Sequence, residues 1–305
     1  MVVAAASGSA PGGLVQLARD GRVATITLDR PAKLNALSDA LVGGLSAAVA
    51  EVAVDESIEV VVLSGNGRAF CAGFDISRGE GSPVPAAGAS KAEVEAYWRA
   101  HFEAATAMLL SIWDLPQPVV AKVHGYCLGG GMHLLLACDL SVAADDAVFG
   151  EPEIELGGVP SFPRLAMALT PCRAGEVLLL GERLGAARAY EIGLVNRVVP
   201  LGELDAVTDA LAGRLAAMPA GALRRAKAVT HRAFELMGLR EAVRFGAGLA
   251  AEALANPSQE AAELERLVAE RGVGAALAAG GGGDRGEGAA PAAGGGGDRG
   301  EGEGP

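Results

Sequence analysis

The chain has 305 residues, half of them apolar, and a formal net charge of −12 at neutral pH. The acidic balance argues against nucleic acid as a partner, because phosphates are bound by Lys and Arg, but it leaves room for a small anionic ligand. No apolar run reaches the roughly 18 to 20 residues that span a bilayer, so we expect no membrane association. The four cysteines form no C-x-x-C pair, so we expect reduced thiols, no metal site and a cytoplasmic location.

Predicted strands and helices alternate over the first two-thirds of the chain, as in α/β proteins. Asp20-Gly21 marks a turn between two strands, and Ser38 is a suitable N-cap for the helix that follows. Two continuous apolar runs are typical of strands buried on both faces. In chain order the patterns predict a strand pair at 14–29, a helix at 38–55, a strand at 58–67, a loop at 77–90, a helix at 91–115 and a strand at 118–125.

The rest of the chain becomes helical and then turns into a low-complexity tail. Helical patterns at 164–180 and 186–192 are flanked by strand-like stretches at 140–150 and 195–200, and residues 204–271 are almost purely helical. The segment AAGGGGDRGEG occurs at 278–288 and again at 292–302, and such a glycine-rich repeat cannot bury enough surface to fold. We therefore expect a core at 13–203 with the functional site, a helical oligomerisation region at 204–272 and a disordered tail at 273–305.

The stretch GYCLGGGMHLLLACDL, residues 125–140, combines three consecutive glycines with an apolar helix. Glycine costs about 1 kcal/mol against alanine inside a helix, so three in a row indicate that the backbone approaches something closely. His133 lies three residues after Gly130 and so shares one helix face with it. Two interpretations stand side by side for the glycines, a site at the backbone or tight helix–strand packing. Two also stand for His133, a site residue or a satisfied core histidine.

Five segments in order resemble the crotonase (enoyl-CoA hydratase/isomerase) superfamily. They are LDRPAKLNAL at 28–37, AFCAGFDI at 69–76, the triple-glycine segment, FGEPEIELGGVP at 149–160 and GERLGAARAYEIGLVNRVVP at 181–200. The resemblance implies an α/β (α+β) fold, a spiral of repeated ββα turns that encloses two sheets, with a helical C-terminal region. It also implies homotrimers, or hexamers made of two trimers.

In the family, an acyl-CoA thioester places its carbonyl oxygen between two backbone N–H groups, which match Phe74 and Gly130 here. The start of a helix suits that task, because its N–H groups are unsatisfied and its dipole favours negative charge. The resemblance places other residues along the substrate and its CoA moiety. These are Arg30, Lys33, Leu34, Ala36, Ala72, Gly73, Asp75, Ile76 and Gly129, with Arg30 and Lys33 as candidates for the phosphates or, alternatively, as ordinary solvated surface residues.

Glu153 matches the family's catalytic carboxylate, and the apolar residues Ile154 and Leu156 that follow it favour desolvation and a raised pKa. Glu151 and Glu155 are rivals in the same segment, for which a solvated acidic loop is the better interpretation. His133 stands where the hydratases have a second glutamate that helps to hold and activate water. A further departure is SFPRLAMAL at 161–169, where the family usually has a glycine-rich turn, so the floor of the pocket is expected to be reshaped.

The resemblance favours an enzyme that hydrates a 2-enoyl-CoA thioester, with Glu153 transferring protons and His133 helping to place water. Because the second glutamate is replaced, a double-bond isomerase with Glu153 as its sole acid and base is a close alternative. An acyl-CoA hydrolase or decarboxylase is a more distant one. RNA binding and a scaffold role are the non-enzymatic alternatives, and the charge of −12 counts against the first. No cofactor is expected beyond the CoA of the substrate.

Overall fold

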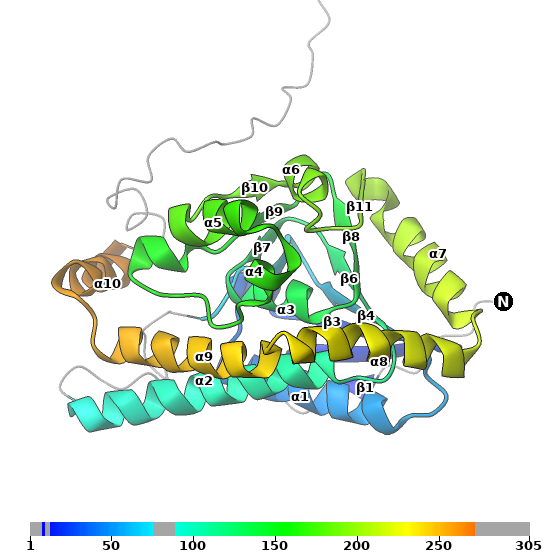
Figure 1. Ribbon diagram of the computed structural model, residues 1–305, viewed down its shortest axis with the longest axis horizontal. Helices are drawn as coiled ribbons and strands as arrows, with labels where there is room; N and C mark the ends of the chain where they lie inside the picture. The colour runs from blue at the N-terminus through cyan, green and yellow to red at the C-terminus, as the bar shows by residue number, and fades with distance from the viewer. Residues whose placement is uncertain (1–7, 10–12, 76–88, 272–305) are drawn as a thin grey trace, which may run out of the picture.

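The computed structural model describes residues 8–9, 13–75 and 89–271. The predicted glycine-rich tail and most of the predicted loop at 77–90 lie outside these ranges. Within them, two β-sheets are wrapped by helices (Figure 1). Among the described helices, none combines the length and apolar character that crossing a membrane requires.

The first sheet has the strand order β1-β2-β3-β4-β6-β8-β11 in the described part of the chain. β1 to β3 pair antiparallel, and β3, β4, β6, β8 and β11 pair parallel. The strand pair predicted at 14–29 and the buried strands predicted at 58–67 and 118–125 are confirmed. The bounds are β1 Gly8–Ser9, β2 Val15–Asp20, β3 Val23–Leu28, β4 Val60–Gly65, β6 Val119–Val123, β8 Leu140–Ala144 and β11 Arg197–Val199.

The second sheet has the order β10-β9-β7-β5 and is built from very short strands. After β4, β6 and β8 the chain crosses each time into this sheet, as β5, β7 and β9, which pair parallel. This confirms the spiral of repeated turns around two sheets that the resemblance implied. The bounds are β5 Ala69–Cys71, β7 Tyr126–Leu128, β9 Val148–Gly150 and β10 Leu184–Gly185.

The helices follow the predicted ranges, with a break that divides the segment at 164–180 in two. Ser38 caps the first helix as predicted, because its hydroxyl accepts a hydrogen bond from Leu41 N at 3.3 Å. The bounds are α1 Asp39–Val54, α2 Lys91–Trp113, α3 Gly130–Ala137, α4 Arg164–Ala168, α5 Pro171–Leu180, α6 Ala186–Glu191, α7 Leu204–Ala216, α8 Ala220–Leu236, α9 Leu239–Ala255 and α10 Gln259–Arg271. Short 3₁₀ turns occur at η1 Pro31–Lys33, η2 Pro152–Leu156 and η3 Leu201–Glu203.

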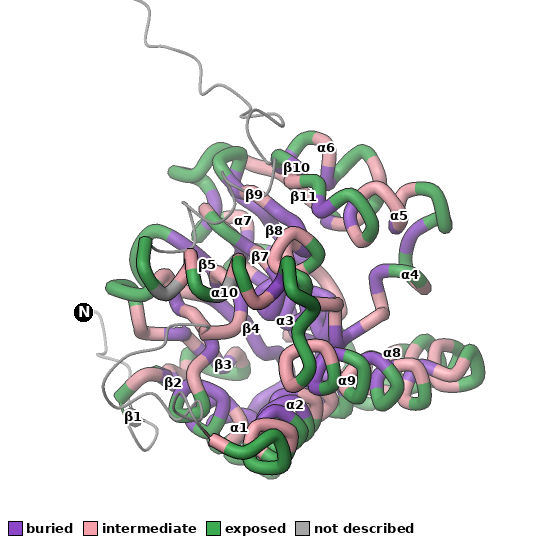
Figure 2. The backbone as a smooth tube through the Cα atoms, turned by 90° about the vertical axis from the view of Figure 1, so that its left-hand side faces the viewer, coloured by how far each residue is buried: buried purple, intermediate pink, exposed green. Residues whose placement is uncertain are grey.

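Both faces of the first sheet are covered, which explains the continuous apolar runs in its strands. Along β4, Val61 and Leu63 pack into the main core with α1 and α2, while Val60 and Val62 pack against α7 on the opposite face. Figure 1 shows α7 lying along that outer face, and Figure 2 shows the strands as the buried centre of the molecule. The division into regions at residue 203 stays a prediction.

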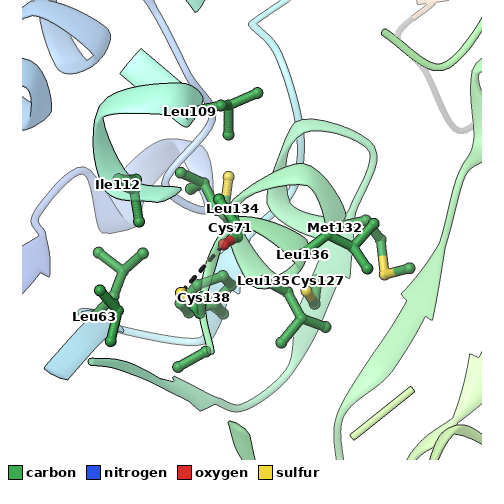
Figure 3. Packing of buried hydrophobic residues seen from close by; sticks show 14 of the residues in the cluster. Leu63, Cys71, Leu109, Ile112, Cys127, Met132, Leu134, Leu135, Leu136 and Cys138 are labelled. Carbon is green, nitrogen blue, oxygen red and sulfur yellow. Dashed lines mark hydrogen bonds between the residues drawn. The ribbon is translucent and has the colours of Figure 1, made fainter. Parts of the chain in front are cut away.

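Helix α3 is buried along its whole length, which explains why its sequence is apolar on every side. Leu134 packs with Cys71 of β5 and with Leu109 and Ile112 of α2 in the main core (Figure 3). The thiol of Cys138, just after the helix, donates a hydrogen bond to the carbonyl of Leu134 at 3.2 Å. Helix α3 is thereby packed between α2 and the strands β5 and β7 of the second sheet.

Candidate active site

The segments around residues 30–37 and 69–75, far apart in the sequence, are joined by backbone hydrogen bonds. Ala72 N donates to Leu34 O at 3.0 Å, and Leu37 N donates to Gly73 O at 2.8 Å. Leu34 and Asn35 adopt left-handed backbone angles, with φ of 50° and 56°. Asn35 is fully buried, and its amide group donates to the carbonyls of Asn66, Ala69 and Phe70 at 2.8 to 3.2 Å. Asn35 therefore connects the two segments, a role that no motif of the sequence indicates.

Replacing Asn35 by alanine is expected to destabilise the fold by about 2 to 4 kcal/mol. The change leaves buried carbonyl groups without a hydrogen-bond donor, and each unsatisfied group destabilises the fold by about 1 to 3 kcal/mol. It also forces alanine into a left-handed backbone conformation. Urea unfolding of Asn35→Ala measures the loss. Asn66→Ala, at an exposed position in the same segment, is the control. It removes only exposed hydrogen bonds with Asp29 and Gly67 and should lie within about 1 kcal/mol of the wild type. Equal stability of the two variants would contradict the assigned role of Asn35.

The residues predicted to line the CoA moiety gather along this junction. Arg30 forms an ion pair with Asp75 at 2.6 Å and donates to the carbonyl of Ala36 at 3.0 Å, so its charge is partly engaged within the protein. Lys33 is exposed at the end of η1. The predicted contact Ile76 lies outside the described residues. Of the two candidates for the CoA phosphates, Lys33 is therefore the one that faces solvent.

The two peptide N–H groups expected to hold the thioester oxygen are oriented by their own carbonyls. In a trans peptide the N–H and C=O groups point in opposite directions. The Gly73 carbonyl accepts the hydrogen bond from Leu37 N, so the Phe74 N–H of the same peptide points away from Leu37. The Gly129 carbonyl accepts from His133 N at 3.0 Å within the first turn of α3, so the Gly130 N–H points out of the helix start. A Cβ on Gly73 would lie 3.6 Å from Gly130 N, which places the two segments side by side.

Each glycine of the triplet faces a different group at close range. A Cβ on Gly131 would lie 2.3 Å from the carbonyl oxygen of Cys71, and one on Gly129 would lie 2.0 Å from Oε1 of Glu153. The Cβ of Gly130 would meet Leu37 and the ring of Phe74 at 2.8 and 3.2 Å. Tight packing therefore explains Gly131 and Gly130, whereas Gly129 leaves room for a carboxyl group.

Glu153 lies in the 3₁₀ turn η2 directly against the start of α3. The turn is closed by a hydrogen bond from Gly158 N to Glu153 O at 2.7 Å. The carboxyl oxygen Oε2 is buried, although the residue as a whole is partly exposed. Burial, reinforced by the like charge of Glu151, raises the pKa of Glu153 from 4.5 to about 8. A carboxyl group with such a pKa can both give and take a proton near neutrality.

The expectation that Glu151 and Glu155 lie in a solvated acidic loop is wrong. Glu151 is 1 % exposed, because it directly follows β9 at the point where Gly150 O accepts from Gly129 N at 2.9 Å. Burial raises the pKa of Glu151 well above its ordinary value. Glu155 is partly buried and forms an ion pair with Arg183 at 3.3 Å. The spacing of the glutamates in the sequence does not predict which of them is buried and which forms an ion pair. Both outcomes depend on contacts with residues far away in the sequence.

His133 is 1 % exposed and lies among the same groups. Its Nε2 is 3.3 Å from Oε2 of Glu151, and its Nδ1 is 3.4 Å from the hydroxyl of Ser161. Burial lowers the pKa of His133 from 6.5 to about 4, so the ring is neutral at pH 7. Across the described residues, no group of three or more His, Cys, Asp or Glu side chains is arranged to hold a metal ion.

Comparisons with known proteins agree with this architecture. The sequence profile of the enoyl-CoA hydratase/isomerase family matches residues 18–266. A Mycobacterium tuberculosis protein named "probable enoyl-CoA hydratase echA8" is 38% identical over 220 residues, which cover 71% of this chain and 80% of that protein. The "crotonyl-CoA hydratase" of Syntrophomonas wolfei is 32% identical over 219 residues, which cover 70% and 80%. The crystal structure of an enoyl-CoA hydratase/isomerase from Xanthobacter autotrophicus superposes with a TM-score of 0.78 at 32% identity, covering 88% of this chain and 97% of that one.

Proposed function

Because the chain belongs to the enoyl-CoA hydratase/isomerase family, we propose that it is an enzyme that adds water across the C2=C3 double bond of a 2-enoyl-CoA thioester. The observation that supports this most directly is the arrangement at the start of α3, where Gly129 accommodates the buried carboxyl group of Glu153. The names of the relatives favour hydration over double-bond migration.

In the proposed reaction the thioester oxygen lies between the N–H groups of Phe74 and Gly130. These donors stabilise the negative charge that develops on the oxygen, and one such donor typically contributes about 2.7 to 4 kcal/mol to transition-state stabilisation. Glu153, with its raised pKa, transfers protons between water and the carbon next to the thioester. His133 helps to place the attacking water. The reaction takes no cofactor besides the CoA that is part of the substrate.

We further propose that the enzyme is cytoplasmic and forms homotrimers or hexamers. The four unpaired cysteines agree with a reducing compartment. Large apolar side chains on α8 and α9, such as Val229, Leu236 and Phe245, are 67 to 73 % exposed, as is typical of surfaces that meet another subunit. Sedimentation equilibrium, which gives the mass of the assembly, tests the oligomeric state.

The proposed activity is tested with a panel of 2-enoyl-CoA and 3-enoyl-CoA esters in heavy water. Hydration is expected to consume the conjugated double bond and to give a 3-hydroxyacyl-CoA with deuterium at C2. Mass spectrometry and the loss of enoyl absorbance follow both changes. A migrated double bond with deuterium but no hydroxyl group would instead identify an isomerase, and free CoA would identify a hydrolase.

A further inference from the structure

Four buried polar atoms without a hydrogen-bond partner gather at one point behind the proposed site. They are Nε2 of His133, both carboxyl oxygens of Glu151 and Oε2 of Glu153. Leaving such groups unpaired is costly, and hydrogens held within the cluster can supply the partners. Nε2 of His133 lies 3.3 Å from Oε2 of Glu151, and the carboxyl groups of Glu151 and Glu153 are close enough for each to shift the pKa of the other.

Two hydrogen atoms satisfy all four positions. The neutral ring of His133 carries one hydrogen, and Nδ1 faces the hydroxyl of Ser161, which can donate to it at 3.4 Å. The ring hydrogen then belongs on Nε2, which lies 3.3 Å from Oε2 of Glu151. Two ionised carboxyl groups offer only acceptors to each other, whereas one proton between them supplies the remaining donor.

We propose that Glu151 is the second carboxyl group of the acid–base centre, sharing a single proton with Glu153 and held in place by His133 and Ser161. This inference rests on the proposed hydration, which it deepens by naming the residue that sets the protonation state of Glu153. Because Glu153 is the member that lies against Gly129, it meets the substrate. Glu151 is a positioning residue that acts through it.

The surroundings of Glu151 leave no other group to hold its charge among the described residues. Glu153 faces it from η2 and His133 from α3, and the thiol of Cys127 in β7 is kept neutral by burial, which raises its pKa well above the ordinary value. The ring of His133 is packed between Phe74 and Phe162, with centroid distances of 5.9 and 6.2 Å. A lone carboxylate in such apolar surroundings is strongly disfavoured, whereas a carboxyl pair with one proton spreads a single charge over both groups.

Two departures of the sequence from the family pattern meet at this point. His133 replaces the second glutamate of the hydratases, and Ser161 and Phe162 open the altered segment after Pro160. The structure brings all three into one cluster with Glu151. The second carboxyl group is thus supplied from the end of β9 instead of from α3, and the altered segment secures the histidine that orients it.

A carboxyl pair that holds one proton can add water to the double bond without a net gain or loss of protons. One O–H bond of water breaks, its oxygen bonds to C3 and its proton passes to Glu153, which is ionised while Glu151 holds the shared proton. The electrons of the C2=C3 bond form a bond from C2 to the proton that Glu153 then gives up. The pair ends the cycle with one proton, as it began. Since both nitrogens of His133 face protein groups, the ring does not contact the water but holds Glu151, which in turn positions Glu153.

Replacing Glu151 by glutamine tests the proposal. The amide keeps the volume and can still donate to Glu153, but it cannot hold an exchangeable acidic proton. The carboxyl C=O band of Glu153, isolated by infrared difference against Glu153→Gln, is expected to titrate about one pH unit or more lower in Glu151→Gln, because the like charge is gone. With 2-enoyl-CoA, kcat should fall by about 10- to 100-fold while KM changes little, and the alkaline limb of the pH profile should move in the same direction.

Glu155→Gln is the matched control, since it makes the same change two residues further on, at a side chain paired with Arg183. Its infrared titration and its pH profile should match those of the wild type. An unchanged titration of Glu153 in Glu151→Gln would overturn the shared proton, and unchanged turnover would overturn the role of Glu151 in the reaction. If the wild type hydrates no enoyl-CoA ester, the proposed function fails, and the infrared titration alone decides whether the pair shares a proton.

Discussion

The Glu153→Gln variant is expected to lose at least about 100-fold in kcat, the usual contribution of a positioned acid–base group, with little change in KM. Glutamine has nearly the same shape and still fits against Gly129, so the binding of the thioester is retained. It cannot take a proton from water or give one to carbon. Initial rates with 2-enoyl-CoA esters, together with calorimetric binding of a saturated acyl-CoA, separate the two effects.

Loss of folding would not explain such a result. The folded-state pKa of Glu153 is raised, from 4.5 to about 8, so the protonated carboxyl group is the form that the fold prefers. The contribution of this carboxyl group to the stability of the fold is fully present below its pKa in the unfolded chain. It is lost as the pH rises through its pKa in the folded protein. Above pH 8 the glutamine variant should therefore be at least as stable as the wild type in thermal unfolding. Retained turnover would remove Glu153 from the mechanism.

The long helices and strands of this fold could be predicted because the burial of their faces sets the spacing of apolar residues along the sequence. The helix at 91–115 and the strands at 58–67 and 118–125 each span enough residues for an apolar pattern to emerge. In the second sheet β5 and β7 were not predicted as strands, and β9 only as part of the strand-like stretch at 140–150, since each of the three is three residues long. Three residues are too few to show a periodic apolar pattern. These stretches form strands because neighbouring strands supply their hydrogen-bond partners.

Apart from what the family resemblance implied, the candidate site was predictable only where a residue type is rare or a backbone position is special. The triple glycine indicated a close approach, and Gly129 does lie against a carboxyl group. Asn35 and Glu151 gave no comparable signal. The carbonyls to which the Asn35 amide donates are 31 or more residues away, and His133, which lies beside Glu151, is 18 residues away. An asparagine in a loop and a glutamate before a proline both look like surface residues until the sheets bring Asn66 and His133 beside them.

The Gly129→Ala variant is expected to reduce kcat/KM by about 100- to 1,000-fold, comparable to the loss of an oxyanion donor, and to cost about 1 to 3 kcal/mol in stability. Gly129 has φ of 49° and ψ of −116°, which alanine rarely adopts, and the new Cβ would lie 2.0 Å from Oε1 of Glu153. The methyl group must displace the carboxyl group and turn the peptide that carries the Gly130 N–H. Steady-state kinetics and urea unfolding measure the two losses.

Two companion variants separate backbone strain from the clash with the carboxyl group. Gly21→Ala introduces a methyl group at a similar φ of 57° with nothing within 4 Å, so it should cost about 1 to 2 kcal/mol with activity intact. In a Glu153→Ala background the Oε1 atom is absent, so adding Gly129→Ala should destabilise the protein less than it does in the wild type. A cost that is the same in both backgrounds would mean that the two residues do not meet, because a double-mutant cycle registers only direct coupling. The start of α3 would then have to lie away from Glu153, and the geometry on which the proposed proton transfer depends would be lost.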